Sequence, residues 1–273
     1  MMRGERSRLI LLAMPAGIVL LTFFLAPLAQ LVAVGASGEN GVAAYASVIT
    51  NSRHLASMVA TVVLAGLVTL SALAIASVAG LFLVRHRFPG RNLLVSTLTL
   101  PMAFPGVVIG FLVILLAGRQ GLLAAVSSAS IGEQIVLAYS IGGLYLGYLY
   151  FSIPRVILTV MAQAETLDPA REEAARSLGA PTWRVVIDVV LPALRPGLIS
   201  AGSICFATAM GAFGTAFTLA TDIDVLPMTI YTEFTLNANI ASAASLSVVL
   251  GAVTWGALLI ARRLSDTAVA TGA

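Results

Sequence analysis

Residues 165–196 read ETLDPAREEAARSLGAPTWRVVIDVVLPALRP, the one long polar stretch in a chain that is otherwise almost continuously apolar. The segments on both sides of it are long enough to cross a bilayer, because about 20 helical residues span a hydrocarbon core of about 30 Å. Hydrophobic residues make up 59% of the 273-residue chain and charged residues 10%, and the mean hydropathy is +1.00. The sequence therefore predicts an integral membrane protein.

Six mainly apolar stretches predict six spans. Only helices and closed barrels satisfy their backbone hydrogen bonds in lipid, and these stretches are too continuously apolar for barrel strands. The predicted fold class is an all-α membrane protein with six transmembrane helices and the polar loop between the fourth and fifth. The predicted spans are residues 9–34, 55–84, 92–117, 133–161, 191–220 and 241–261.

The predicted organisation divides the chain into four parts. Residues 1–8 form an N-terminal segment, and residues 9–34 form the first span. Residues 55–262 form a core of five helices that includes the loop 165–192, and residues 263–273 form a frayed C-terminal tail. A cleaved signal sequence is the alternative for the first span, although its apolar run exceeds the usual core of about 7–15 residues.

The placement of the arginines predicts the orientation. All fifteen basic residues are arginine. With both termini in the cytoplasm, thirteen arginines, Arg155 among them, fall on the cytoplasmic side or at its boundary, and only Arg53 and Arg119 fall outside. This bias follows the positive-inside rule, so the stretch 165–196 is predicted to be cytoplasmic.

The composition excludes several classes of protein. A chain without lysine can form neither a Walker A loop nor a retinal Schiff base. His54 and His86 lie far apart, which leaves no haem or metal constellation, and Cys205 is expected to be a small buried residue. The net charge of +3 reflects topology and does not indicate a nucleic-acid partner.

Two functional alternatives are disfavoured on the same grounds. A membrane-embedded enzyme finds no support, because no nucleophile, base and orienting residue fall together. A stand-alone secondary transporter usually carries ionisable residues inside its spans, and the predicted spans hold essentially none away from their ends.

Local signals divide the polar stretch into two short helices. Asp168 followed by Pro169 is typical of an N-cap and first helical residue, and Gly179 is typical of the position just after a helix. A second short helix is predicted from Thr182 to about Val190, before the chain enters the membrane at Leu191-Pro192. The first helix would carry a face of small or apolar residues suited to docking on another protein: Ala170, Ala174, Ala175 and Leu178.

The same stretch resembles a known family. Glu173-Ala174-Ala175, with Gly179 four residues after the last alanine and Leu191-Pro192 further on, resembles the EAA loop of ATP-binding-cassette (ABC) importer permeases, EAA-x3-G-x9-I-x-LP. Val189 stands where that pattern has isoleucine. The resemblance covers roughly residues 50–262.

The resemblance implies a multi-pass subunit of a bacterial-type inner membrane that is not itself an enzyme. Its loop would be a coupling helix seated in a cytoplasmic ATPase, and two ATP-binding subunits would carry the ATP and Mg²⁺, leaving this chain without a cofactor or metal. A second permease subunit, expected to be a related chain and not a copy, and an external solute-binding protein would complete the importer. The residues implied in ATPase coupling are Glu173, Ala174, Ala175, Gly179, Asp168, Arg176 and Leu178.

Kinked and hydroxyl-bearing helices are the candidates for the translocation path, because they present polar atoms without a buried charge. Two patterns, Gly106-x-x-x-Gly110 and Gly143-x-x-x-Gly147, are compatible with close helix packing. The path candidates are Pro101, Phe104, Pro105, Thr208 and Thr215, and the candidates for docking the binding protein are Asp222, Asp224 and Glu233.

The predicted cargo is a small polar solute. Pro154-Arg155 and the run at residues 226–231 most resemble permeases for polyamine, ferric iron, sulfate or molybdate, and phosphonate. A polyamine such as spermidine or putrescine is the first expectation, because acidic residues predicted to lie outside would favour a cation. Ferric iron, sulfate or molybdate, and phosphonate are the alternatives.

Overall fold

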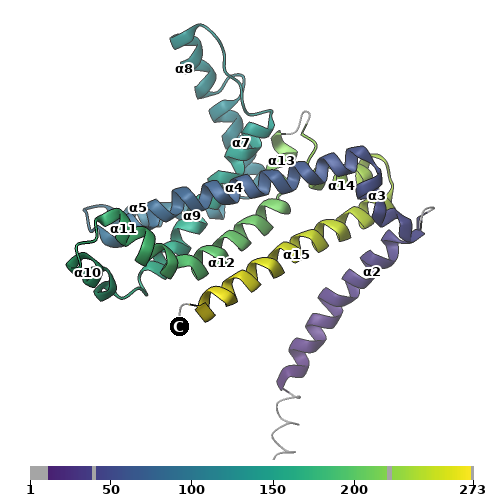
Figure 1. Ribbon diagram of the computed structural model, residues 1–273. Coiled ribbons are helices and arrows are strands. Elements are labelled where there is room, and N and C mark those ends of the chain that lie inside the picture. The colour runs from purple at the N-terminus through teal and green to yellow at the C-terminus, as the bar shows by residue number, and fades with distance from the viewer. Residues whose placement is uncertain (1–11, 39–40, 220–222, 272–273) are drawn as a thin grey trace, which may run out of the picture. The chain divides into compact units, whose positions relative to one another are not determined.

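The computed structural model describes residues 12–38, 41–219 and 223–271, and helices are the regular secondary structure throughout these ranges (Figure 1). Six of them are long and apolar enough to cross a membrane, which confirms the predicted all-α class with six spans. These six helices are Leu12–Gly35, Ser52–Arg85, Gly106–Ile131, Ile141–Ala164, Thr182–Met210 and Ile240–Arg263.

The chain divides into two compact units. Unit 1 comprises Met1–Leu55 and Thr229–Gly251, and unit 2 comprises Ala56–Met228 and Ala252–Ala273. The helices α4 (Ser52–Arg85), α14 (Leu226–Tyr231) and α15 (Ile240–Thr271) contribute residues to both units.

Unit 1 begins with the described part of the first span. This helix includes the π-turn η1 (Leu21–Leu25) and ends as α2 (Ala26–Gly35), and the short helices η2 (Gly41–Ala46) and α3 (Ser47–Thr50) follow it. The Tyr45 hydroxyl donates to the carbonyl oxygen of Val32, which ties η2 back to α2. Gly35 leaves room for this contact, since a Cβ there would lie 2.7 Å from the Tyr45 hydroxyl oxygen.

The core of unit 2 is built around α4, α9 (Ile141–Ala164) and α12 (Leu191–Met210). Small residues set the distances between these helices. A Cβ on Gly80 of α4 would lie 2.9 Å from Val160 of α9, and a Cβ on Gly202 of α12 would lie 3.0 Å from Leu73 of α4. The helix α9 also packs against α7 (Gly106–Ala117) and α13 (Gly214–Leu219).

Glycines of both predicted packing patterns lie at close helix contacts. A Cβ on Gly110 would lie 2.5 Å from Thr218 of α13, and a Cβ on Gly147 would lie 2.7 Å from Thr215. The prediction of close packing is therefore confirmed for α7, α9 and α13. Gly143 differs, because its neighbours are backbone atoms of the chain just before α9.

The third span is displaced from its predicted position. Residues 92–117 do not form one helix: α5 (Arg91–Leu98) and α6 (Leu100–Ala103) precede a break, and the membrane-length segment runs from α7 to the end of α8 (Leu122–Ile131). The break is extended backbone at Phe104 and Pro105, with ψ of 133° and 150°. Pro105 lacks an amide hydrogen and disfavours helical geometry at the residue before it, which explains the interruption.

The fourth span begins later than predicted, at Ile141 instead of Glu133. The helix α8 ends at Gly132, which has a φ of +75°, and residues 134–137 have no regular structure. Ser140 then caps α9, because its hydroxyl oxygen accepts a hydrogen bond from the Gly143 amide at 3.4 Å.

The fifth span differs at both ends. No break occurs at Leu191-Pro192, because α11 (Thr182–Val185) and the π-turn η3 (Val186–Val190) continue directly into α12. The π-turn η3 is wider than an α-helical turn and lies just before Pro192. In a regular α-helix the proline ring would clash with the carbonyl group of Asp188, four residues earlier. At the other end the span stops at Met210, and α13 begins only at Gly214.

The last helix, α15, continues past Arg262-Arg263 to Thr271, so the described part of the predicted tail is helical. Residues 257–271 contain neither glycine nor proline, so nothing in the sequence ends the helix at Arg262-Arg263.

Candidate functional site

The helix α10 (Pro169–Ser177) has the caps that the sequence predicts. The Asp168 carboxylate accepts a hydrogen bond from the Ala170 amide at 2.9 Å. At the other end the Gly179 amide donates to the Arg176 carbonyl oxygen at 2.9 Å, and the Ala180 amide donates to the Ala175 carbonyl oxygen at 3.1 Å. Gly179 has a φ of +83°, which completes a Schellman motif and turns the chain toward α11.

One face of α10 packs against the protein itself. Ala175 is half-buried and contacts a cluster of buried side chains on the following helix, Val185, Val190 and Leu194. Ala175, predicted to share a face with Ala174, thus lies on the side of α10 that packs against the start of the fifth span. Its small side chain instead allows α10 to lie close to the start of the fifth span.

The opposite face of α10 is exposed. Glu173 and Ala174 lie on it, and the Leu178 side chain beyond its last turn is 90% exposed. On α11 the Trp183 side chain is 60% exposed. Large apolar side chains this accessible, next to exposed charges, are typical of a surface that another protein covers. We call the exposed residues Glu173, Ala174, Leu178 and Trp183 the docking face.

An ion pair fixes α10 to the end of α4. Arg85 donates through Nη2 to Oε1 of Glu172 at 2.6 Å, and Arg176 donates to Oε2 of the same carboxylate at 3.2 Å. Both carboxylate oxygens of Glu172 are thus engaged, and its side chain is only 16% exposed. Local sequence patterns do not reveal this pair, because 87 residues separate its members.

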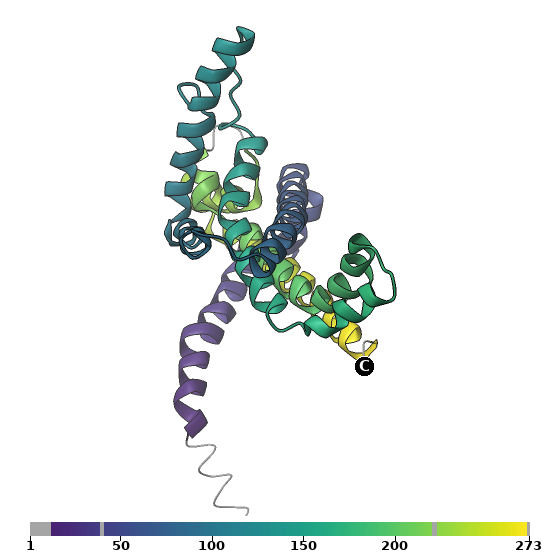
Figure 2. The same ribbon diagram turned by 90° about the vertical axis from the view of Figure 1, so that its left-hand side faces the viewer.

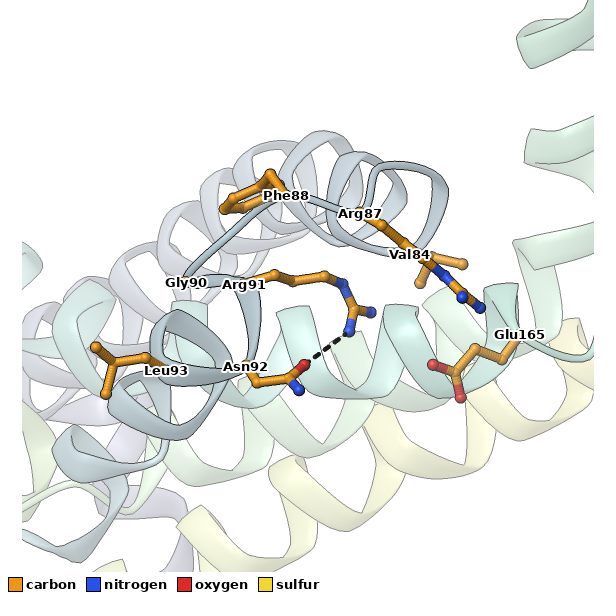
Figure 3. A pocket seen from close by; sticks show the side chains of 8 residues that line it. All are labelled: Val84, Arg87, Phe88, Gly90, Arg91, Asn92, Leu93 and Glu165. Atoms are coloured by element: carbon orange, nitrogen blue, oxygen red, sulfur yellow. Dashed lines mark hydrogen bonds between the residues drawn. The ribbon is translucent and has the colours of Figure 1, made fainter.

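A second polar feature lies at the turn between α4 and α5. A cavity of about 630 Å³ is bounded there by the side chains in Figure 3, which shows Arg87 and Glu165 extending from two different elements toward the same space. Arg91 is held by its Nε hydrogen bond to the Leu83 carbonyl oxygen at 2.6 Å. The turn after α4 therefore lies beside the start of the loop that carries α10, and Figure 2 shows α10 and α11 folded against each other.

Four of the five path candidates line one cavity of about 290 Å³ inside unit 2. The cavity lies where two helical segments are interrupted, between α6 and α7 and between α12 and α13. Pro105, the fifth candidate, is the N-cap of α7 and is not among the lining residues. The four that line it are Pro101, Phe104, Thr208 and Thr215.

Arg155 of α9, predicted to be one of the boundary arginines, also lines this cavity. It lies nine residues before the end of α9 at Ala164, about 14 Å inside the helix. Its Nη1 donates to Oγ1 of Thr208 at 2.8 Å. Among the described residues no carboxylate pairs with it. The assumption that the spans lack an internal ionisable residue is therefore wrong at Arg155.

The threonine hydroxyls of the cavity are engaged with the backbone. Thr208 donates to the Ile204 carbonyl oxygen at 2.7 Å, and Thr215 donates to the Gly106 carbonyl oxygen at 3.0 Å. Each hydroxyl has one hydrogen, so neither retains a donor for a solute in this arrangement. The hydrogen bond of Thr215 also joins α13 to the start of α7 across the two interruptions.

Two of the three acidic docking candidates belong to the described residues. Asp224 is an exposed residue of unit 2, and Asp222 lies outside the described residues. Glu233 belongs to unit 1, in η4 (Thr232–Leu236), where its side chain is 18% exposed and lies 3.9 Å from His54. It also accepts a hydrogen bond from Asn237 at 3.1 Å, so its carboxylate is partly engaged within the chain.

Cys205 is buried, as predicted. Among the described residues no three or more histidine, cysteine or acidic side chains are placed to bind a metal ion.

Comparisons with known proteins match most of the chain. A family model described as "Binding-protein-dependent transport system inner membrane component" matches residues 72–267. Sulfate permease 2, chloroplastic, of Chlamydomonas reinhardtii is 34% identical over 197 residues, which cover 71% of this chain and 53% of that protein. The molybdenum transport system permease protein of Escherichia coli (strain K12) is 34% identical over 193 residues, covering 67% of this chain and 81% of that protein.

A solved structure has the same fold. It is a crystal structure of a bacterial alginate ABC transporter in complex with alginate pentasaccharide-bound periplasmic protein. One of its chains matches with a TM-score of 0.82 at 17% identity, covering 96% of this chain and 95% of that one.

Proposed function

Because the chain belongs to the family of binding-protein-dependent transport system inner membrane components, the permease subunits of ABC importers, we propose that it carries a small oxyanion such as sulfate or molybdate. The observation that carries this proposal is the similarity to a sulfate permease and a molybdenum permease over about two thirds of the chain. Molybdenum dissolves in neutral water as the tetrahedral dianion molybdate, so both names point to one class of cargo.

Arg155 supports an anion over the polyamine expected from the sequence. A fixed positive charge in the cavity repels a di- or polycation, and no carboxylate among the described residues offsets it. Asp224, the described acidic candidate of unit 2, is not among the lining residues. Polyamine, ferric iron and phosphonate remain as the alternatives that an uptake assay has to separate.

The partners follow from the family. Two ATP-binding subunits on the cytoplasmic side would bind ATP and Mg²⁺, an external binding protein would deliver the solute, and a second permease subunit, a related chain, would complete the path. Both chain termini and α10 would face the cytoplasm, in agreement with the distribution of the arginines.

The docking face of α10 and α11 is the proposed contact with an ATP-binding subunit. Leu178 and Trp183 supply exposed apolar area there, and Ala174 permits close approach. Glu173 is free to meet a basic group, because the ion pairs of α10 use Glu172 instead. Asp168, Arg176 and Gly179 hold the helix ends and its shape.

Two rigid connections would carry movement of α10 toward the cavity. The Arg85–Glu172 pair joins α10 to α4, and the cluster around Val185 joins it to the fifth span. That span is one continuous helix from Thr182 to Met210, and Thr208 near its end lines the cavity. Closure of the ATPase subunits would therefore tilt helices whose far ends bound the path, as alternating access requires.

The cargo is tested with the complete importer. The permease, its ATP-binding subunits and its binding protein are reconstituted in proteoliposomes, and uptake of radiolabelled sulfate, molybdate, phosphonate, spermidine, putrescine and ferric iron is measured with and without ATP. The proposal expects ATP-dependent uptake of sulfate or molybdate that requires the binding protein. Uptake of a polyamine without either oxyanion would contradict it.

The coupling role is tested on α10. Glu173→Lys should abolish uptake and association with the ATP-binding subunits, and Gly179→Asp should weaken both, while the chain still inserts in the membrane. Glu165→Lys is the matched control, because this exposed carboxylate precedes α10 and lies outside the docking face. Normal transport by both α10 variants would show that α10 is not the coupling element.

A further inference from the structure

We propose that Arg155 is the residue that binds the oxyanion within the membrane, in the cavity between α6, α7, α9, α12 and α13, and that Thr208 positions it. This proposal rests on the oxyanion function proposed above. It adds a specific binding site in the permease itself, distinct from the site on the external binding protein.

Arg155 places a positive charge well inside a spanning helix. An arginine about 14 Å inside a membrane helix is costly unless it meets water, a counter-ion or a hydrogen-bond acceptor, and such residues usually mark a solute pathway. Arg155 is half-buried and lines the cavity, and among the described residues no carboxylate neutralises it. An anion in the cavity would be the missing counter-ion.

The hydrogen-bond donors of Arg155 are mostly unused. A guanidinium group has five N–H donors in a planar fork. One of them, on Nη1, goes to Oγ1 of Thr208, and no other hydrogen bond of this side chain is formed with the described residues. The remaining donors can bind two oxygens of one tetrahedral oxyanion side by side, a geometry that suits arginine better than lysine.

Thr208 acts on Arg155 and not on the anion. Its hydroxyl hydrogen is donated to the Ile204 carbonyl oxygen, so the lone pairs of Oγ1 face the guanidinium and accept its hydrogen bond. This arrangement holds one edge of the fork against α12 and leaves its other donors for the cavity. Thr208 is therefore a positioning residue.

The other described residues that line the cavity carry no negative charge that would repel an anion or pair with Arg155. Apolar side chains make up most of the remaining lining, among them Phe104, Ile109 and Phe151. None of the described residues in this lining is acidic. The helix α7 begins at this wall with Gly106, so the positive end of its dipole lies beside the site and adds to the attraction for an anion.

The cavity that Arg155 lines is large enough for a small hydrated ion. At about 30 Å³ for each water molecule, a cavity of about 290 Å³ corresponds to roughly ten waters. A sulfate or molybdate ion with part of its hydration shell fits this space, and a cargo that keeps some water can leave the site again. A tightly enclosing site would instead hold the ion and stop transport.

The site also lies where the helices can move. The break between α6 and α7 and the break between α12 and α13 both border the cavity. Tilting of the fifth span from its α10 end would displace Thr208 relative to Arg155 on α9. The hydrogen bond between them would then lengthen or re-form, so that affinity for the anion would differ between the inward-open and outward-open states.

The test uses the complete importer in proteoliposomes with sulfate and molybdate as probes. Arg155→Gln should lower ATP-driven uptake of both ions at least about tenfold, as expected for loss of a charge-assisted bidentate contact. Arg155→Lys should retain a substantial part of the uptake, because it keeps the charge. Binding-protein-stimulated ATP hydrolysis should change by less than about twofold in both variants, because α10 is untouched.

Two further variants test the positioning role. Thr208→Val removes the acceptor oxygen with little change in shape and should lower uptake several-fold, whereas Thr208→Ser should behave as the unaltered protein. Arg119→Gln is the matched control for loss of an arginine, since Arg119 lies over the Tyr139 ring at 5.9 Å and does not line the cavity.

A binding measurement makes the assignment independent of transport. Equilibrium binding of radiolabelled sulfate to the detergent-purified permease–ATPase complex, without the binding protein, should be measurable for the unaltered complex and lost in Arg155→Gln. Unchanged sulfate binding in that variant would overturn the site. Equal losses of uptake in the Gln and Lys variants, with a lowered thermal midpoint in both, would also overturn it, because they indicate a structural arginine.

The outcomes separate this inference from the function on which it rests. If the unaltered importer moves neither sulfate nor molybdate, the oxyanion function is wrong. If it moves them and Arg155→Gln moves them equally fast, the function stands and the intramembrane site is wrong.

Discussion

The ion pair between Arg85 and Glu172 is expected to govern how firmly α10 is attached to the membrane helices. Arg85 is the last residue of α4, and the carboxylate lies on α10 at 2.6 Å from its guanidinium nitrogen. The side chains are 29% and 16% exposed, so the pair is neither free in solvent nor fully buried. We consider the substitutions Arg85→Gln and Glu172→Gln, singly and together.

The free energy that the Arg85–Glu172 ion pair contributes follows from its intermediate burial. Exposed ion pairs contribute about 0.2–1 kcal/mol, and breaking a buried pair costs about 3–5 kcal/mol. A half-buried pair with a short charge-assisted hydrogen bond should contribute about 1–2 kcal/mol, which is a factor of roughly 5–30 in an equilibrium constant. Each single substitution should weaken association of the permease with its ATP-binding subunit by a factor in this range.

The assay is a double-mutant cycle on that association, measured with purified subunits in detergent at fixed ionic strength. The double variant should be no weaker than either single variant, because the same interaction is lost in all three. Arg87→Gln is the control, since Arg87 lies in the same turn and forms no ion pair with a described residue. Strictly additive losses, or single variants that bind as the unaltered protein does, would refute the reasoning.

Two substitutions of glycine test the geometry on which the site depends. Gly179→Ala should destabilise the turn after α10 by about 1–2 kcal/mol, because the backbone there has a φ of +83°, a left-handed conformation that a residue with a Cβ adopts at a cost. The loss is measured as weaker association with the ATP-binding subunit. Gly179→Asn should have a milder effect, because asparagine tolerates this conformation better than alanine does. Gly110→Leu should lower the thermal midpoint of the purified protein, because even a Cβ would lie 2.5 Å from Thr218, whereas Gly66→Leu, with no atom within 4 Å of its Cβ, should leave the midpoint unchanged.

Local sequence signals anticipated the parts of the structure that depend on neighbouring residues. Asp168 and Gly179 mark the ends of the first cytoplasmic helix because capping uses hydrogen bonds between residues two to five positions apart. Pro105 marks the interruption before α7 for a similar reason, since it acts on its own turn and the residue before it.

Features that depend on tertiary contacts were not predictable from one sequence. Arg155 counts as a boundary arginine when spans are drawn from hydropathy. The packing of α9 against α12, which the sequence does not reveal, places it beside Thr208. The partnership of Arg85 with Glu172 joins segments 87 residues apart. The inward face of Ala175 depends on the cluster around Val185, which helical periodicity within α10 does not reveal.

The exposed face of α10 and α11 is the proposed contact with an ATP-binding subunit. The most direct measurement places a photo-crosslinking amino acid at Leu178, whose side chain is 90% exposed, and another at Ser130, an exposed residue of α8. In membranes that contain the complete importer, Leu178 should give a crosslink to the ATP-binding subunit and Ser130 should not. A crosslink from Ser130 with none from Leu178 would contradict the claim.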